Sequence, residues 1–215
     1  MKYMIKIIPE TGNISSENSV TILVGTTLSG KCLPFQVIYY KQEDDYSLLD
    51  FPKNWHITFT PKAKSNTISL LQYLEVILVP YINETKRLLG CPDEQYTILI
   101  LDKNGPHRSK LFLDNLHNAN ICEIFVPGAQ TKTSQPIDIV GSTSDNLKTE
   151  LFEKLQIHYN RNNDSQSLSQ SVLRLSDMKK KHAHSLVAAY RNIENNPINI
   201  IRGWEKSGIE KAVFK

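Results

Sequence analysis

The chain has 215 residues, of which 40% are hydrophobic, and its formal net charge is +3. This length allows one sizeable core, and the composition excludes a globally disordered protein. The mild positive charge permits a nucleic-acid partner without requiring one. No apolar run reaches membrane-spanning length, so we expect no membrane association. The three cysteines (Cys32, Cys91 and Cys122) are far apart and form no Cys-x-x-Cys pair, which argues against a zinc knuckle or a disulfide framework.

Short strands are predicted in the first part of the chain. The runs Val20–Leu28 and Leu33–Tyr40 are rich in β-forming residues and flank the turn Ser29–Lys31, which predicts a β-hairpin. Residues 41–55 are acidic, polar and turn-rich, as is typical of a loop. The run His56–Phe59 is predicted to be one more short strand.

A long, interrupted helix is predicted next. Ser65 or Asn66 is a natural N-cap, and apolar residues recur at helical spacing from there to about Leu89. Pro80 lies inside this pattern and predicts a kink or a break, because proline has no amide hydrogen to donate. Gly90 begins a group of helix-stop and turn residues, so the helix should end there.

A strand–helix–strand unit is predicted after this helix. Thr97–Leu101 and Ile121–Val126 are apolar runs of strand length, and a helix is expected between them from about Ser109 to His117. Because a helix connects the two strands, they should be parallel, and the hairpin before them makes the sheet mixed. A further helix is predicted from about Pro136 to Ile157.

The C-terminal part of the chain is predicted to be helical. We divide the chain into an α/β domain at residues 1–157, a polar linker at 158–171 and a small helical segment at 172–215. The basic run Lys179–Lys181 lies in that segment. It is compatible with a nuclear-import signal or a DNA-facing patch, although runs of this kind favour a solvated helix face.

Two carboxylates and one histidine are the candidates for chemistry. Asp102 ends an apolar strand, and Asp138 lies at the start of a predicted helix beyond the next strand. Acids at strand ends commonly hold divalent metals, and polynucleotide-cutting enzymes use paired acids to hold two ions. His107 is a candidate general base, metal ligand or phosphate contact. Each residue also has a simpler interpretation: Asp102 as a turn cap, Asp138 as an acid favoured by the helix dipole, and His107 as polar surface.

Three sequence motifs contain or flank these candidates. They are Leu99-Ile100-Leu101-Asp102-x-x-x-x-His107, Phe125-Val126-Pro127 and Thr131-x-Thr133-x-Gln135-Pro136-Ile137-Asp138. Together they resemble the DDE-type transposase domain of the pogo/Tigger/jerky group. Other segments resemble the same family, so that the resemblance covers nearly the whole chain; examples are Ser29-Gly30-x-x-Leu33-Pro34 and Gly203-Trp204-x-x-Ser207-Gly208-Ile209.

The resemblance implies a ribonuclease-H-like fold, in which a mixed sheet is flanked by helices, and a set of three catalytic acids that hold two Mg²⁺ or Mn²⁺ ions. By position, Asp102 matches the second acid and Asp138 the third, so both are the implied metal ligands. His107 is a further candidate for a catalytic role. The resemblance also implies DNA as a partner, leaves room for protein partners, and implies a nuclear location.

The first acid of that family lies on the opening strand, shortly before a Lys-Tyr dipeptide. Lys2-Tyr3 takes the position of that dipeptide here, so we expect the first acid to lie upstream of Met1. The opening strand is central in this fold, between the hairpin and the parallel pair, and its truncation predicts a gap with unpaired backbone groups. The segment Met1–Ile8 is apolar enough to fill part of that gap, a hypothesis that unpaired residues there would refute.

Three functions are compatible with these observations. The favoured prediction is a transposase-derived domain that binds nucleic acid without cutting it, because two acids hold two metal ions poorly. The alternative is an active metal-dependent DNA endonuclease whose first acid comes from an upstream segment. An unrelated α/β enzyme or binding domain is the least favoured, because the chain has no Gly-rich phosphate loop and no nucleophile elbow.

Overall fold

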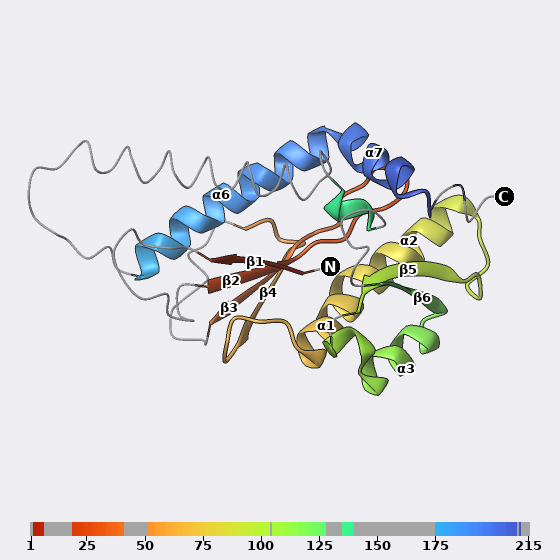
Figure 1. Ribbon diagram of the computed structural model, residues 1–215, viewed down its shortest axis with the longest axis horizontal. Helices are drawn as coiled ribbons and strands as arrows, with labels where there is room; N and C mark the ends of the chain where they lie inside the picture. Colours follow the sequence, from red (N-terminus) through yellow and green to blue (C-terminus); the bar gives the residue numbers. More distant parts are fainter. Residues whose placement is uncertain are drawn as a thin grey trace, which may run out of the picture.

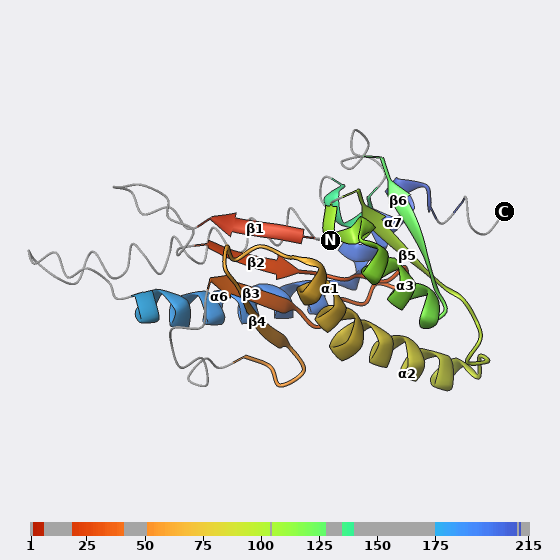
Figure 2. The same cartoon turned by 90° about the horizontal axis from the view of Figure 1, so that it is seen from below.

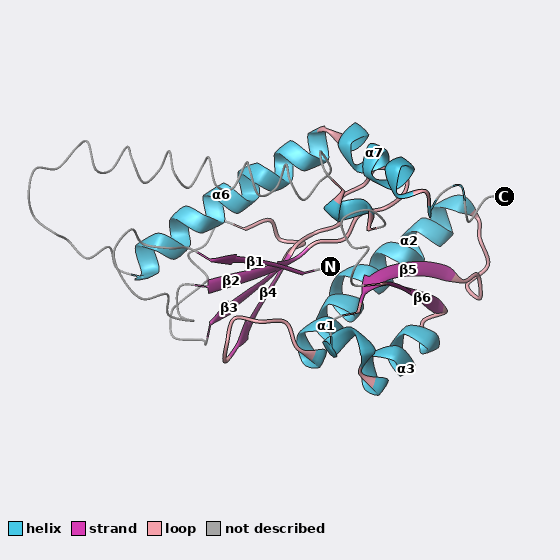
Figure 3. Cartoon of the chain, in the orientation of Figure 1, coloured by secondary structure: helices cyan, strands magenta, loops and turns pink. Residues whose placement is uncertain are grey.

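The computed structural model describes residues 2–6, 19–40, 51–103, 105–127, 135–139, 175–209 and 211, which form strands and helices in three layers (Figures 1 and 3). The strands are β1 (Lys2–Lys6), β2 (Ser19–Leu23), β3 (Gln36–Tyr40), β4 (His56–Thr60), β5 (Thr97–Asp102) and β6 (Ile121–Val126). The helices are α1 (Thr67–Tyr73), α2 (Val79–Leu89), α3 (Lys110–Asn118), α6 (Leu175–Asn195) and α7 (Pro197–Ser207). The shorter helical turns are η3 (Leu74–Leu78), η4 (Gly105–Arg108) and η6 (Pro136–Asp138).

The first sheet has the strand order β1-β2-β3-β4. Strands β1, β2 and β3 are antiparallel, as the predicted hairpin requires, and β4 lies parallel to β3. The pairing of β1 is in register from Lys2 opposite Leu23 to Lys6 opposite Ser19. Residues Lys2–Lys6 are therefore paired, so the observation that would refute the hypothesis is not seen, and that Met1–Ile8 fill part of the gap beside the parallel pair stays a prediction.

The hairpin turn requires glycine at one position. Gly30 has φ +87°, a left-handed conformation that L side chains rarely adopt. A Cβ atom at Gly30 would also lie 2.9 Å from Cγ1 of Ile201 and 3.1 Å from the carbonyl oxygen of Pro197. The turn therefore fits against α7 only because residue 30 has no side chain.

The long helix predicted between residues 65 and 89 is present, with the predicted interruption. Asn66 caps it, since its side chain accepts a hydrogen bond from the amide of Ser69 at 2.9 Å, and Ser69 Oγ accepts one from the amide of Asn66 at 2.9 Å. Pro80 lies in the first turn of α2, directly after the π-helical turn η3. Because Pro80 donates no hydrogen bond, the preceding turn widens. Gly90, at φ 65°, ends the helix.

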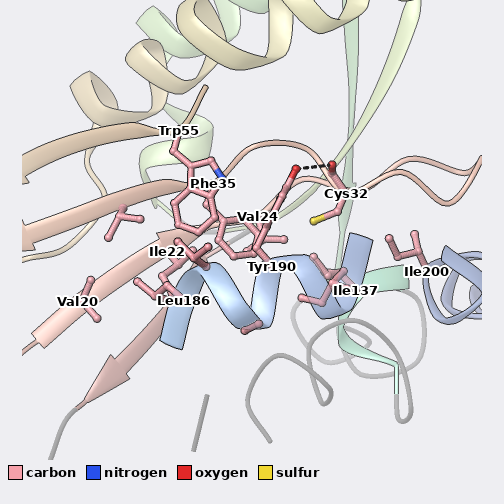
Figure 4. Packing of buried hydrophobic residues seen from close by; sticks show 14 of the residues in the cluster. Val20, Ile22, Val24, Cys32, Phe35, Trp55, Ile137, Leu186, Tyr190 and Ile200 are labelled. Atoms are coloured by element: carbon pink, nitrogen blue, oxygen red, sulfur yellow. Dashed lines mark hydrogen bonds between the residues drawn. The ribbon is translucent and has the colours of Figure 1, made fainter. Parts of the chain in front are cut away.

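One face of the first sheet packs against α6. Ile22 and Val37 are opposite each other on β2 and β3, and both are fully buried in a cluster that includes Leu186 and Tyr190 of α6. Figure 4 shows Tyr190 beside Phe35, with ring centroids 4.9 Å apart at 83°, and its hydroxyl donating to the carbonyl oxygen of Cys32 at 3.4 Å. Burial in this cluster raises the pKa of the Cys32 thiol to about 12.

The position of α6 bears on the predicted division of the chain. Its side chains share one hydrophobic cluster with the sheet, so the helical segment and the strands form a common core. The predicted linker at residues 158–171 lies outside the described residues. The division into domain, linker and helical segment therefore stays a prediction.

The opposite face of the first sheet packs against α1 and α2 (Figure 2). Leu23 and Ile38 alternate with the residues of the first cluster, as strand geometry dictates, and lie in a second cluster. That cluster also contains side chains from the second sheet and its helix: Leu101, Phe112, Leu116 and Ile121. The helix α1–α2 is thus the layer that joins the two sheets.

The second sheet consists of β5 and β6, which are parallel as predicted, with Thr97 opposite Ile121 and Asp102 opposite Val126. The mixed α/β fold with flanking helices is confirmed, and it is consistent with a ribonuclease-H-like domain. In the part of the chain that the structure describes, however, the strands form two sheets and not one, because no ladder connects β5 to the first sheet. No helix in the described ranges is long and apolar enough to cross a membrane.

The segment that begins at Pro136 differs from the predicted α-helix. Pro136–Asp138 is a single 3-10 turn, and Ile139 after it is extended, with φ −68° and ψ 135°. The prediction of an α-helix starting at Pro136 is therefore wrong at its start. Proline at the first position fits a helical turn of either kind, so it did not distinguish the two. Residues 140–157 of the predicted helix lie outside the described residues.

Candidate functional site

Asp102 is the last residue of β5 and lies opposite Val126 of β6. The preceding residue, Leu101, is buried in the second hydrophobic cluster, which fixes the end of the strand. The strand leaves that cluster at Asp102, whose side chain is 28% exposed. A carboxylate is thus held at the carboxyl end of a parallel strand, as the sequence predicts, although only Leu101 of that strand is buried.

His107 lies against this carboxylate. Its Nδ1 atom is 2.6 Å from Oδ1 of Asp102 and 3.2 Å from the main-chain oxygen of Asp102. Both neighbours are acceptors, so Nδ1 carries the hydrogen and donates it, and Nε2 holds the lone pair whenever the ring is neutral. The imidazole is only 1% exposed, so it does not offer itself to a phosphate on the surface.

The turn that carries His107 is fixed from both sides. It is the 3-10 turn η4, and α3 begins directly after it with Ser109 as N-cap, whose side chain accepts from the amide of Phe112. The His107 ring lies 6.2 Å from the Phe112 ring, centroid to centroid, and Phe112 is buried. Packing and capping therefore hold the histidine against the strand end.

Asp138 is the last residue of the 3-10 turn η6, and its side chain lies outside what the structure describes. The backbone nevertheless places this turn near the other candidates. Gln135, Pro136 and Ile137 line the same cavity as Leu101 and His107. The structure thus brings the segment of Asp138 to one cavity with the end of β5, while the convergence of the two carboxylates stays a prediction.

This inter-sheet cavity has a volume of about 660 Å³. It is lined by Leu23–Ser29, by Thr97–Leu101, by His107, by Gln135–Ile137, by one face of α1–α2, and by Trp204 and Ile209. Two polar atoms at its wall, the Tyr73 hydroxyl and Gln135 Oε1, are buried and have no hydrogen-bond partner among the described residues. Burial raises the pKa of Tyr73 above its ordinary value.

Sequence reasoning included Gln135 in a motif but gave it no role, and it missed Tyr73 altogether. The sequence could have indicated Gln135, because this polar residue belongs to the motif Gln135-Pro136-Ile137-Asp138. No sequence signal indicated Tyr73, because an aromatic residue at helical spacing is ordinary core. Tyr73 differs from an ordinary core residue only in the structure, where it lines the inter-sheet cavity and its hydroxyl has no hydrogen-bond partner among the described residues.

The described residues do not by themselves fit a divalent metal. Within these ranges no group of three or more His, Cys, Asp or Glu side chains is arranged to hold an ion. Mg²⁺ prefers several oxygen ligands, whereas Asp102 has one carboxylate oxygen engaged by His107. We therefore assign no chemical step to a metal at this site.

Comparison with known protein families gives one match. The model described as DDE superfamily endonuclease matches residues 17–204, a range that includes Asp102, His107 and Asp138. The chain therefore belongs to the DDE superfamily endonuclease family, and this membership implies a transposase-derived nuclease. Comparisons with the curated proteins and with the solved structures found no match.

Proposed function

We propose that this chain is a transposase-derived DDE domain of the pogo/Tigger/jerky type that binds DNA and does not cleave it unaided. The family supplies DNA as the substrate class. A net charge of +3 favours a modest, salt-dependent attraction to phosphates over a tight complex. We further propose that the protein acts in the nucleus, as a domain of this descent would.

The bond between His107 and Asp102 is the observation that carries the proposal. Two-metal cleavage needs carboxylates that share a pair of ions about 3.5–4 Å apart. The carboxylate of Asp102 is engaged by a buried histidine at 2.6 Å, and a competing ion would have to replace that charge-assisted bond. With Asp138 as the only other acid that matches the family pattern, we expect too little negative charge for two ions.

An active endonuclease is the second candidate. It requires a third carboxylate from a segment that reaches Asp102, and the inter-sheet cavity beside Leu101 and His107 is the observation that favours it, since it leaves space for such a segment. In this alternative, Mg²⁺ or Mn²⁺ would be held by Asp102 and Asp138 together with the added acid.

A nicking assay separates the two candidates. Supercoiled plasmid is incubated with the purified chain and Mn²⁺, next to the variants Asp102→Asn and Asp138→Asn and the matched control Asp114→Asn, an exposed acid on α3. We expect no cleavage above background from any of the four proteins. Cleavage by the wild type and Asp114→Asn that disappears in the other two variants would overturn the proposal in favour of the active enzyme.

DNA binding needs its own measurement. Fluorescence anisotropy of a labelled duplex should report weak binding that falls steeply as salt rises, because each neutralised phosphate releases counterions. Affinity that is the same at low and high salt, or no binding at low salt, would contradict the proposal. Imaging of the tagged protein tests the location, and exclusion from the nucleus would contradict that part.

A further inference from the structure

Positive charge is concentrated in two segments of the chain. Residues 51–74 and 103–113 contain six of the 25 lysine and arginine residues and none of the 22 aspartate and glutamate residues. The rest of the chain therefore has 19 cationic against 22 acidic side chains. A local excess of this kind creates a positive potential for anions that a net charge of +3, spread evenly over the surface, would not give.

The fold brings these two segments to one side of the molecule. The loop at residues 61–66 leads directly into α1, and α1 contacts both η4 and α3. Leu70 of α1 and Phe112 of α3 are buried in the same hydrophobic cluster, on the side of the first sheet opposite to α6. Figures 1 and 2 show α1 beside α3 in both views. The cations next to α1 and η4 therefore lie in one region.

The turn before α1 holds two lysines in a fixed place. Ala63 is fully buried, and its carbonyl oxygen accepts a hydrogen bond from the Thr21 hydroxyl at 2.6 Å. The Thr60 hydroxyl donates to the carbonyl oxygen of Lys64 and accepts from the amide of Lys64, both at 2.9 Å. Lys62 and Lys64, on either side of the buried Ala63, are exposed. The turn thus presents two ammonium groups on a backbone that is fixed from the inside.

The backbone of Ala63 is unusual for a residue with a side chain. Its φ of 48° lies in the left-handed region, which residues other than glycine rarely adopt. Such strain persists only where the surrounding structure fixes it, and it is concentrated at functional sites. The conformation of Ala63 therefore supports a function for the two lysines that flank it.

Lys103 and Arg108 are a second pair of cations. Lys103 follows Asp102 at the end of β5, Arg108 is the last residue of η4, and both side chains are exposed. Within the ranges that the structure describes, neither forms an ion pair, whereas Nζ of Lys110 lies 2.6 Å from Oδ2 of Asp114. A cation without a carboxylate partner can bind a phosphate without first giving up another charge-assisted bond.

We propose that this chain contacts the phosphate backbone of DNA through one basic surface, formed by Lys62, Lys64, Lys103 and Arg108. The inference rests on the proposed function, since it takes DNA as the partner, and it adds where the duplex lies. The duplex would cross the start of α1 and the turn η4. Because phosphate contacts carry no information about the bases, binding through this surface alone would be independent of DNA sequence.

Double variants that each remove two positive charges test this assignment by fluorescence anisotropy of a labelled duplex. The first is Lys62→Gln with Lys64→Gln, and the second is Lys103→Gln with Arg108→Gln. The control is Arg202→Gln with Lys206→Gln, which changes two exposed cations of α7 in the other helical layer. Equal melting temperatures of the wild type and all three variants show that each is folded.

The expected effect follows from counterion release. Each phosphate contact contributes about 0.9 to the slope of log affinity against log salt concentration. The first two variants should therefore lower this slope by about 1–2 and weaken binding roughly 10- to 60-fold at about 0.1 M salt. The control should leave the slope unchanged. An equal loss in all three variants would mean that the duplex is attracted by charge anywhere on the surface, and would overturn the inference.

Lysine acetylation of the wild type measures the same contact without any substitution. Acetic anhydride modifies exposed lysines, and mass spectrometry reads the extent at each position. Bound duplex should reduce the labelling of Lys62, Lys64 and Lys103 severalfold and leave Lys206 unprotected. Equal protection of all four lysines, or protection of none while the duplex is bound, would overturn the inference.

The remaining outcomes separate this inference from the proposed function. If the wild type binds the duplex and neither of the first two variants weakens it, the chain binds DNA elsewhere, which overturns the inference and leaves the proposed function standing. If the wild type does not bind the duplex even at low salt, both are overturned. Binding to phosphatidylserine vesicles in place of the duplex would assign the basic surface to a membrane, and would also overturn both.

Discussion

His107 and Asp102 form a partly buried pair across the end of β5, with Nδ1 of the imidazole 2.6 Å from Oδ1 of the carboxylate. The imidazole is almost fully buried, whereas the carboxylate keeps some contact with solvent. The pair therefore ties a 3-10 turn to a strand end, and it gives the carboxylate a fixed orientation that a free surface acid would not have.

The strength of this pair is measurable by a double-mutant cycle. We expect His107→Ala and Asp102→Ala to show a coupling free energy of about 1.5–3 kcal/mol in urea unfolding, because the hydrogen bond is charge-assisted and shielded from water. The control cycle uses Lys110 and Asp114, an exposed i,i+4 pair at 2.6 Å on α3, for which about 0.5 kcal/mol or less is expected. Coupling no larger than in the control would show that the pair does not stabilise the strand end.

Leu186 tests whether α6 shares a core with the sheet. It is 1% exposed and packs in the cluster of Ile22 and Phe35, so Leu186→Ala should lower the free energy of unfolding by about 2–5 kcal/mol. Leu89→Ala is the matched control, since Leu89 is 72% exposed and should cost little. A loss confined to a separate, early unfolding transition of the C-terminal helices would instead support an independent helical segment.

Residue 25 must be glycine because a side chain there would have too little space, and not because of its backbone conformation. A Cβ atom there would lie 2.6 Å from the Tyr73 hydroxyl and 2.9 Å from Cδ1 of Leu33. Gly25→Ala should therefore destabilise the protein by about 1–3 kcal/mol, the usual cost of overpacking. Calorimetry should show that Tyr73→Phe alone is neutral or stabilising, because this buried hydroxyl has no partner among the described residues, and that it recovers part of the loss in Gly25→Ala.

If the double variant recovers none of the lost stability, then Leu33, and not the tyrosine hydroxyl, is the group that excludes a side chain at residue 25. A large loss in Tyr73→Phe alone would contradict the prediction in another way. It would show that the hydroxyl makes a stabilising interaction, for example with water in the inter-sheet cavity.

The lowered pKa of His56 predicts how the stability of the fold depends on pH. His56 is the first residue of β4. Burial there lowers its pKa from the ordinary value of 6.5, because the charged ring loses hydration. The unfolded chain therefore binds the proton more readily than the folded one. The free energy of unfolding should be highest above pH 6.5 and should fall as the pH drops below that value towards the lowered pKa of the folded state.

Urea unfolding at a series of pH values measures this effect. The variant His56→Gln should lose part of the decline below pH 6.5, whereas His184→Gln, an exposed residue of α6, should keep it. An identical decline in the wild type and His56→Gln would exclude His56 as its source.

Local signals in the sequence determined the individual elements. Asn66 as a cap, the interruption before Pro80 and the stop at Gly90 all follow from groups within one helical turn, and the structure confirms each. The hairpin and the parallel pair of strands follow equally from residue type and from the connecting helix. The position of Asp102 at a strand end is predicted for the same reason.

Tertiary structure alone decided how these elements meet. His107 carries the same sequence signal whether it lies in solvent or against Asp102, because burial depends on Phe112 and on the layers around it. The 3-10 turn at Asp138 was not distinguishable from a helix start by its proline. Above all, the cavity between the two sheets and its mainly apolar walls emerged only from packing, since side chains far apart in the chain form it together.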